Sequence, residues 1–138
     1  MQTLEQMRAA FALERIDQVK AGADNAKYKT QLLKLPARLH NNGLGQTVAF
    51  YLTAGPKKPE WIICDWLQDW LSRPKEMGPA IYPLGKDLIG CVSGKDLPKD
   101  ADPELLYRQA SDEARAIAVW LKRFAEAFIQ EKGQEKGK

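Results

Sequence analysis

The sequence contains few of the residues that build catalytic or metal centres. Its 138 residues include one histidine, His40, and two cysteines, Cys64 and Cys91, that lie 27 positions apart. Neither cysteine has another cysteine or a histidine close to it in the sequence, and this spacing excludes a zinc site and a CxxC redox motif. Cys64 follows two isoleucines, an apolar setting that favours packing over reactivity. The sequence therefore predicts that the protein binds no metal and no cofactor.

Long hydrophobic runs and targeting signals are also missing. No window approaches the roughly 20 apolar residues of a transmembrane helix. The first six residues lack the basic segment followed by an apolar segment that marks a secretory signal. The apolar content of 44% and the charged content of 28% are typical of soluble globular proteins. We therefore predict a cytoplasmic protein.

The motifs of the common enzyme classes are absent. Gly43-Leu44-Gly45 lacks the preceding strand and the third glycine of a dinucleotide-binding loop, and there is no Walker lysine. His40 has no carboxylate, serine or cysteine partner within reach in the sequence. Asp65 and Asp69 share a helix face, as Glu113 does with its neighbours, but such carboxylates usually lie on a solvated surface rather than in a catalytic acid pair. The sequence predicts no enzymatic activity.

What the sequence does contain is apolar residues at helical spacing along most of its length, without strand-like alternation. It predicts an all-α fold, a compact single-domain bundle of five to six helices over residues 1–131, followed by a polar tail at 132–138. The last helix is expected to be the longest, with Phe128 on its buried seam, and Leu13 is expected on the apolar face of the first helix. A capping box at Thr3 and Gln6 begins the first helix, and an Asx N-cap at Asp102 followed by Pro103 begins the last one. The expected helical segments cover residues 3–22, 26–34 and 37–42 on either side of Pro36, 44–53, 59–72, a short piece within 84–92, and 102–131.

The stretch from Leu35 to Leu52 contains two apolar helices that meet at Asn41-Asn42-Gly43. Pro36 disfavours helix at the residue before it and removes an internal hydrogen bond, so we expect a kink or a break there. Asn42-Gly43 supplies the left-handed residue that ends the first helix, and Gly45 allows another part of the chain to approach the backbone closely. The two asparagines are expected to cap a helix and fix its angle rather than to carry chemistry.

Three tryptophans fall in the helix expected at 59–72. Trp66 and Trp70 lie on a stripe with Ile63 and Leu67 and are predicted to be core residues. Trp61 lies off this stripe, and two roles stay open for it, one facing solvent and one facing a partner protein.

In the last helix Arg108, Arg115 and Lys122 repeat every seven residues along one exposed face. Asp112 interrupts this face at i+4 from Arg108, which favours a solvated, salt-bridged surface over a nucleic-acid contact. Together with Trp61, the three basic residues are candidate protein-interface residues.

Residues 73–103 hold five of the eight prolines and four of the ten glycines, which predicts an irregular connection with one short helix. Three roles stay open for this connection: a binding insert, a packing insert and a mobile loop.

Positive charge is concentrated in one part of the chain. The net charge is +3, and residues 18–58 contain seven basic residues against one acidic residue, Asp24, whereas residues 61–138 contain twelve against thirteen. Such a region fits electrostatic contact with the sugar–phosphate backbone of RNA, or it only keeps a small protein in solution. The candidate RNA-binding residues are Lys20, Lys27, Lys29, Lys34, Arg38, Asn42 and Gln46.

Four stretches of the chain are similar to the small α-helical subunit of type III-B CRISPR effector (Cmr) complexes. They are Leu35–Ala37, Asn41–Phe50, the N-terminal Leu4–Ala12 and the late helix Tyr107–Ala125. The resemblance implies a non-catalytic subunit in antiviral defence. Copies of it would stack into a filament beside the backbone subunits that hold the guide RNA, and the two filaments would enclose the guide–target duplex. Target cleavage would belong to the backbone subunit, and no cofactor would be required.

A second function stays open from the residues alone. The chain would then be a helical protein–protein adaptor with no RNA role, and its basic region would serve only solubility. Trp61 and the proline-rich residues 73–103 would form the interface of such an adaptor.

Overall fold

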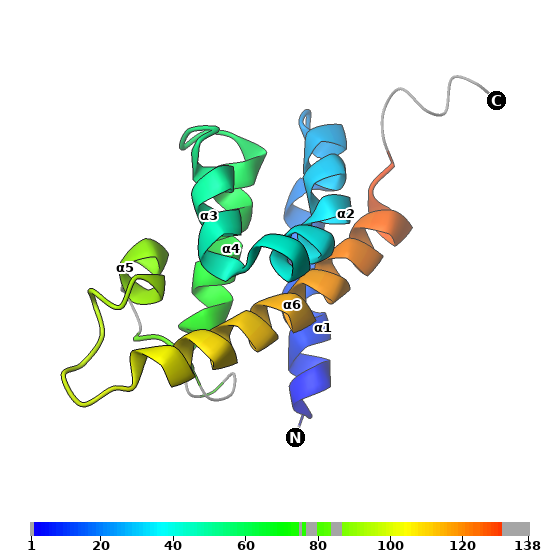
Figure 1. The fold of residues 1–138 in the computed structure, drawn as a ribbon. Helices are drawn as coiled ribbons and strands as arrows, with labels where there is room; N and C mark the ends of the chain where they lie inside the picture. The colour runs from blue at the N-terminus through cyan, green and yellow to red at the C-terminus, as the bar shows by residue number, and fades with distance from the viewer. Residues whose placement is uncertain (1, 75, 77–79, 84–86, 131–138) are drawn as a thin grey trace.

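Six helices form the fold of this computed structural model, which describes residues 2–74, 76, 80–83 and 87–130 (Figure 1). They are α1 (Leu4–Val19), α2 (Asn25–Asn42), α3 (Leu44–Leu52), α4 (Pro59–Leu71), α5 (Leu88–Val92) and α6 (Pro103–Phe128). No strand occurs in these ranges, and the all-α single-domain prediction is confirmed. None of the six described helices is long and apolar enough to span a membrane. The tail at 132–138 lies outside the described residues.

The longest helix, α6, runs across the molecule and packs mainly against α1 and α2 (Figure 1). It begins as the sequence predicts, because the Asp102 side chain accepts a hydrogen bond from the Leu105 backbone N–H and Pro103 occupies the first turn. Small side chains line its buried face and let the neighbouring helices approach closely. Its end at Phe128 comes earlier than residue 131, and Phe128, expected in the core, is 45% exposed.

The core tryptophans are where the sequence places them. Trp66 stacks on Tyr28 with ring centroids 5.7 Å apart, and Trp70 meets Phe11 at 5.0 Å. Both tryptophans are buried, and these contacts join α4 to α2 and to α1. Aromatic pairs of this kind bury large apolar surfaces in preferred geometries, so α4 is fixed against both N-terminal helices.

The capping box at the start of α1 is confirmed. The Thr3 hydroxyl accepts from the Gln6 backbone N–H at 3.1 Å, and the Gln6 side chain accepts from the Thr3 backbone N–H at 2.9 Å. The helix ends at Val19, with Lys20 as its C-cap, and therefore before Gly22. Leu13, expected on the apolar face, is instead 39% exposed.

Pro36 does not break the chain into two helices, so the prediction of a break is wrong. α2 continues from Asn25 to Asn42 with the proline inside it. A proline inside a helix costs about 3 kcal/mol or more. Burial on both sides of the proline offsets this cost, because Leu32 and Leu35 have no exposed surface and Leu39 has 1%.

A single residue, Gly43, connects α2 to α3. Its φ of 85° and ψ of 164° place it in a region that is essentially limited to glycine. Its N–H donates to the Leu39 carbonyl at 3.0 Å and closes α2. Asn41 and Asn42 are exposed, and neither side chain forms the cap expected of it. The close approach at Gly45 is confirmed, because its N–H donates to the Tyr107 hydroxyl of α6 at 2.9 Å.

We expect Gly43→Ala to lower the free energy of unfolding by about 1–3 kcal/mol, since an L-residue is strained at this φ and ψ. Gly22→Ala is the matched control. Gly22 has no positive φ, and an added Cβ would lie 3.6 Å from the Val19 carbonyl oxygen, an ordinary contact. This control should leave stability unchanged or raise it by up to about 1 kcal/mol. Urea denaturation of the three proteins measures the difference, and equal stabilities would contradict the strain at Gly43.

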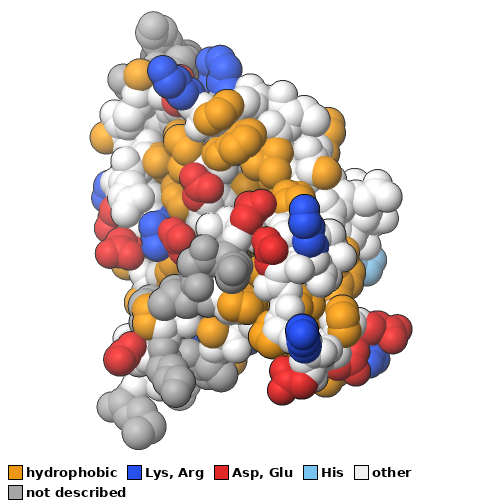
Figure 2. All heavy atoms as spheres, turned by 90° about the vertical axis from the view of Figure 1, so that its left-hand side faces the viewer, with side chains coloured by type: hydrophobic (Ala, Val, Ile, Leu, Met, Phe, Trp, Pro, Cys, Tyr) orange, Lys and Arg blue, Asp and Glu red, His pale blue; other side chains and the backbone are white. Residues whose placement is uncertain are grey.

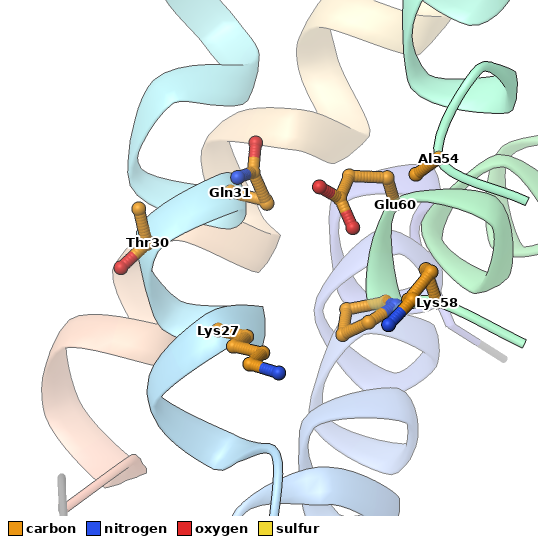
Figure 3. Close-up of a pocket in the computed structure, with 7 residues that line it drawn as sticks. Lys27, Thr30, Gln31, Ala54, Lys58 and Glu60 are labelled. Carbon is orange, nitrogen blue, oxygen red and sulfur yellow. The ribbon is translucent and has the colours of Figure 1, made fainter.

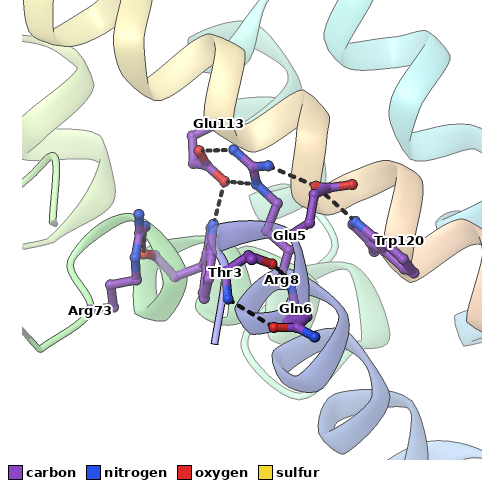
Figure 4. Close-up of polar contacts among 8 residues, drawn as sticks. Thr3, Glu5, Gln6, Arg8, Arg73, Glu113 and Trp120 are labelled. Atoms are coloured by element: carbon purple, nitrogen blue, oxygen red, sulfur yellow. Dashed lines mark hydrogen bonds and ion pairs between the residues drawn. The ribbon is translucent and has the colours of Figure 1, made fainter. Parts of the chain in front are cut away.

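A buried ion pair joins α1, α4 and α6, contrary to the prediction that Glu113 is a surface residue (Figure 4). Glu113 is 8% exposed, and its two carboxylate oxygens accept from Arg8 Nε at 2.6 Å and Arg8 Nη2 at 2.8 Å. Trp70 Nε1 donates to the same carboxylate at 2.9 Å. Burial acts to raise the pKa of Glu113, but the hydrogen bonds from Arg8 and Trp70 outweigh it and lower the pKa. Glu5 pairs with the same Arg8 at the exposed end of this cluster.

The described part of residues 73–103 packs against α4. α5 confirms the short helix, and its Leu88 N–H donates to the Gln68 side chain at 3.0 Å. Ile81 and Tyr82 both donate their backbone N–H groups to the Leu71 carbonyl, at 2.9 and 3.0 Å. A Cβ on Gly90 would lie 1.9 Å from an Asp96 carboxylate oxygen, so a larger residue would require the Asp96 side chain to move. Residues 75, 77–79 and 84–86, which belong to the same predicted connection, lie outside the described ranges.

Candidate nucleic-acid interface

One exposed face of α2 brings several of the candidate RNA-binding residues together. Lys27, Gln31, Lys34 and Arg38 are four, three and four residues apart, and this spacing places them on the same side of the helix. Lys34 is exposed and forms no hydrogen bond or ion pair with any residue that the structure describes. The face therefore presents a row of cations about 16 Å long, at 1.5 Å of rise per residue.

Neutral groups hold Arg38 in place. Its Nη1 donates to the Gln31 side-chain oxygen at 2.6 Å and to the Tyr51 hydroxyl at 3.1 Å, and the Tyr51 hydroxyl donates to the Gln31 backbone carbonyl at 2.9 Å. The guanidinium carbon lies 5.2 Å from the centroid of the Phe50 ring. Arg38 has no carboxylate partner among the described residues, so its positive charge is oriented but not neutralised.

A cavity of about 360 Å³ lies beside this face, between α2 and the start of α4 (Figure 3). Lys27, Thr30 and Gln31 of α2 line one side of it, and Lys58 and Glu60 reach into it from the other. The charged side chains that line it are two lysines and one carboxylate, and one of these lysines, Lys27, also pairs with Asp24 at 3.9 Å. The cavity extends the basic face toward α4.

The α2–α3 corner adds amides and an aromatic ring. Asn42, at i+4 from Arg38, is exposed at the end of α2, and Gln46 is exposed in the first turn of α3. Phe50 follows Gln46 at i+4 and is 58% exposed. Sequence reasoning missed Phe50 as a functional residue, although its spacing from Gln46 and its place off the buried Leu44–Val48 stripe could have indicated it. We refer to Lys27, Gln31, Lys34, Arg38, Asn42, Gln46, Phe50 and Lys58 as the basic face.

Two predicted RNA-binding residues lie apart from the basic face. Lys29 is two positions from Lys27, so it lies on another side of α2, where its ammonium donates to the Ile129 carbonyl at 3.2 Å. Lys20 is the C-cap of α1, and its ammonium pairs with Asp17 at 3.0 Å. In this fold Lys29 connects α2 to the end of α6 and Lys20 stabilises the end of α1.

The candidate protein-interface residues fall in two places. Trp61 is half-buried and lines a cavity of about 230 Å³ with side chains from α3, α4 and α5. On the face that these helices share, hydrophobic side chains adjoin acidic ones (Figure 2). On α6, Arg115 pairs with Asp112 at i+3, whereas Arg108 is exposed and Lys122 is half-buried. The expected salt bridge therefore forms with Arg115 rather than with Arg108.

Burial shifts the pKa values of one cysteine and two aspartates of α4. Burial raises the pKa of the Cys64 thiol to about 12, so it is protonated and a poor nucleophile at neutral pH. Burial also raises the pKa values of Asp65 and Asp69, but no cluster of three or more metal-binding side chains occurs among the described residues.

Comparisons with known proteins agree on one family. A family model described as CRISPR-associated protein (Cas_Cmr5) matches residues 4–128. The CRISPR system Cmr subunit Cmr5 of Thermus thermophilus is 32% identical over 136 residues, which cover 95% of this chain and 100% of that protein. A crystal structure of a CRISPR-associated Cmr5 family protein from Thermus thermophilus matches with a TM-score of 0.68 and 26% identity, over 94% of this chain and 100% of that one.

Proposed function

Because this chain belongs to the Cmr5 family of CRISPR-associated proteins, we propose that it is a non-catalytic small subunit of a type III-B Cmr complex and contacts the RNA backbone there. Family membership carries the assignment to a Cmr complex. The observation that carries the RNA contact is the basic face, where Lys34 and Arg38 present cations without a carboxylate partner among the described residues.

The chemistry of the basic face fits a sugar–phosphate backbone. Arginine and lysine bind phosphate through charge-assisted hydrogen bonds, and the amides of Asn42 and Gln46 can bond phosphate or ribose oxygens. Such contacts hold a strand without reading its bases. In RNA-guided complexes, base pairing with the guide supplies the sequence information. A protein subunit that recognises only the backbone is sufficient for this role.

The partners follow from the same proposal. The basic face would meet the guide RNA and the target RNA, and other surfaces would meet the backbone subunit and further copies of this chain in a cytoplasmic filament. Trp61 and the face of α6 that carries Arg108, Arg115 and Lys122 are the proposed protein contacts. The protonated Cys64 thiol, a poor nucleophile, supports a non-catalytic role.

A filter-binding titration of single-stranded RNA against salt tests the RNA contact. We expect log K to fall linearly with log salt, with a slope of about −2 to −3 if three or four phosphates are contacted, because each contact on a single strand contributes about −0.7. The same protein, reconstituted with the other subunits of its complex, should protect the target RNA. Binding to those subunits that does not depend on salt, without measurable RNA affinity, would instead support a helical adaptor.

A further inference from the structure

Phe50 differs from the other exposed hydrophobic residues in how much of its side chain is exposed and in the residue beside it. It is 58% exposed, more than any other large hydrophobic side chain that the structure describes. The opposite side of α3 is core, with Leu44, Val48 and Tyr51 each 1% exposed. A single exposed hydrophobic residue needs no explanation by itself. This one lies beside a cation, Arg38, that has no carboxylate partner among the described residues.

Arg38 retains the donors that a phosphate requires. A guanidinium has five N–H donors, and the two on Nη1 are directed at Gln31 and Tyr51. Nε and Nη2 form no hydrogen bond with any described residue. Neither atom is among the buried polar atoms that lack a partner. The side chain is already held in one conformation, so a ligand would not have to order it.

We propose that Phe50 and Arg38 form a binding site for one unpaired nucleotide, in which the Phe50 ring stacks on the base and Arg38 binds the adjoining phosphate. The site rests on the proposed RNA contact and adds a base contact to it. The guanidinium carbon lies over the Phe50 ring, 5.2 Å from its centroid, so the base would stack on the ring face turned away from Arg38 while its phosphate reaches the guanidinium. Single-stranded nucleic acids are commonly bound by this combination of backbone cations and an aromatic platform, without base selectivity.

The neighbouring residues fit the same ligand. Lys34, one helical turn before Arg38, is positioned for the next phosphate along the strand. Gln46, one turn before Phe50, offers amide donor and acceptor groups to a ribose or a base edge. A base inside a duplex is already stacked on both sides and cannot stack on Phe50. The site therefore favours single-stranded or bulged RNA over perfect duplex.

Matched RNA oligonucleotides with and without bases separate stacking from phosphate contact. A single-stranded adenosine oligonucleotide, an abasic oligonucleotide of the same length and a 2-aminopurine-labelled oligonucleotide serve as probes with the full-length protein. We expect Phe50→Ala and Phe50→Leu to weaken binding of the base-containing RNA by roughly 5- to 150-fold, the range expected for one stacked base. Binding of the abasic RNA and the salt slope should not change. Phe50→Trp should retain the affinity and the quenching of 2-aminopurine.

Arg38→Gln is the complementary variant. It should weaken binding of both oligonucleotides and reduce the magnitude of the salt slope by about 0.7. If Phe50→Leu binds base-containing RNA as wild type does, while wild-type binding still depends on salt, the stacking site is wrong and the proposed function stands. If wild type binds no RNA, both fail. If Phe50→Ala instead impairs only assembly with the other subunits, the ring is a protein contact and the proposal is overturned.

Discussion

Replacing Glu113 by alanine is expected to lower the free energy of unfolding by about 3–5 kcal/mol, the usual loss when one partner of a buried ion pair is removed. The Arg8 side chain is only 17% exposed and would keep only the exposed Glu5 as an acidic partner. The Trp70 N–H would also lose its acceptor. A second cation is close to this tryptophan, because the guanidinium carbon of Arg73 lies 4.1 Å from the centroid of the Trp70 ring. Urea denaturation followed by tryptophan fluorescence measures the loss.

Glu5→Ala is the matched control for this prediction. Glu5 forms an ion pair with the same arginine at 2.7 Å, but its side chain is 64% exposed. Exposed ion pairs contribute little to stability, so this variant should change the free energy of unfolding far less than Glu113→Ala does. If both variants lost the same stability, burial of the Glu113 pair would not be the source of the effect.

The same ion pair predicts a pH dependence. The pKa of Glu113 is lowered below its ordinary value of 4.5, because the bonds from Arg8 and Trp70 outweigh the opposing effect of burial. Its contribution to stability is therefore present above pH 4.5 and is lost as the pH falls through the lower pKa of the folded state. Accordingly, the stability difference between wild type and Glu113→Gln should be constant near neutral pH and shrink under acid conditions.

Reversing two charges on the basic face, Lys34→Glu together with Arg38→Glu, is expected to weaken binding of single-stranded RNA by at least about 100-fold. Each charge-assisted contact contributes about 1.5–3 kcal/mol, and every 1.4 kcal/mol is a factor of ten. The salt slope should lose about 1.4 of its magnitude, since two phosphate contacts are removed. Filter binding over a series of salt concentrations measures both quantities. Thermal unfolding checks the fold, because Arg38 also holds Gln31 and Tyr51.

Arg108→Glu together with Lys122→Glu changes the net charge by the same amount on α6 instead of α2. This variant should retain most of the RNA affinity. Equal losses in the two variants would mean that binding responds to net charge alone, and the basic face would then not be the contact surface. The double variant Lys34→Gln with Arg38→Gln removes the same two positive charges without adding negative charges that would repel RNA.

Local signals in the sequence were sufficient for the helices. The capping box at Thr3, the Asx cap at Asp102 and the stripe with Trp66 and Trp70 each depend on residues within a few positions of one another. Pro36 shows the limit of such signals, because burial against other elements offsets the cost of the proline. Apolar periodicity indicates where helices can form. Tertiary packing decides whether a helix continues through a residue such as Pro36.

The candidate site was less accessible to sequence reasoning. Glu113 and Arg8 are 105 positions apart, so no local pattern could indicate that they form a buried pair. Phe50 meets Arg38 only because the chain turns back at Gly43. Lys29 is different, since its two-residue offset from Lys27 already placed it on another side of a helix. The charge count placed the lysines in one group because they are close in the sequence. In the fold, their side chains lie on different sides of the helices.

The single-residue connection at Gly43 also determines whether the protein or the RNA loses more conformational entropy on binding. A connection of one residue between two packed helices limits how far the backbone at Arg38 can move relative to the backbone at Phe50, so we expect their separation to change little when RNA binds. The protein then acts as a rigid template, and nearly all the conformational freedom lost on binding is lost by the strand. An unpaired nucleotide flanked by segments that are already paired with a guide has less freedom to lose, and would bind this template more tightly than the same nucleotide in a free strand.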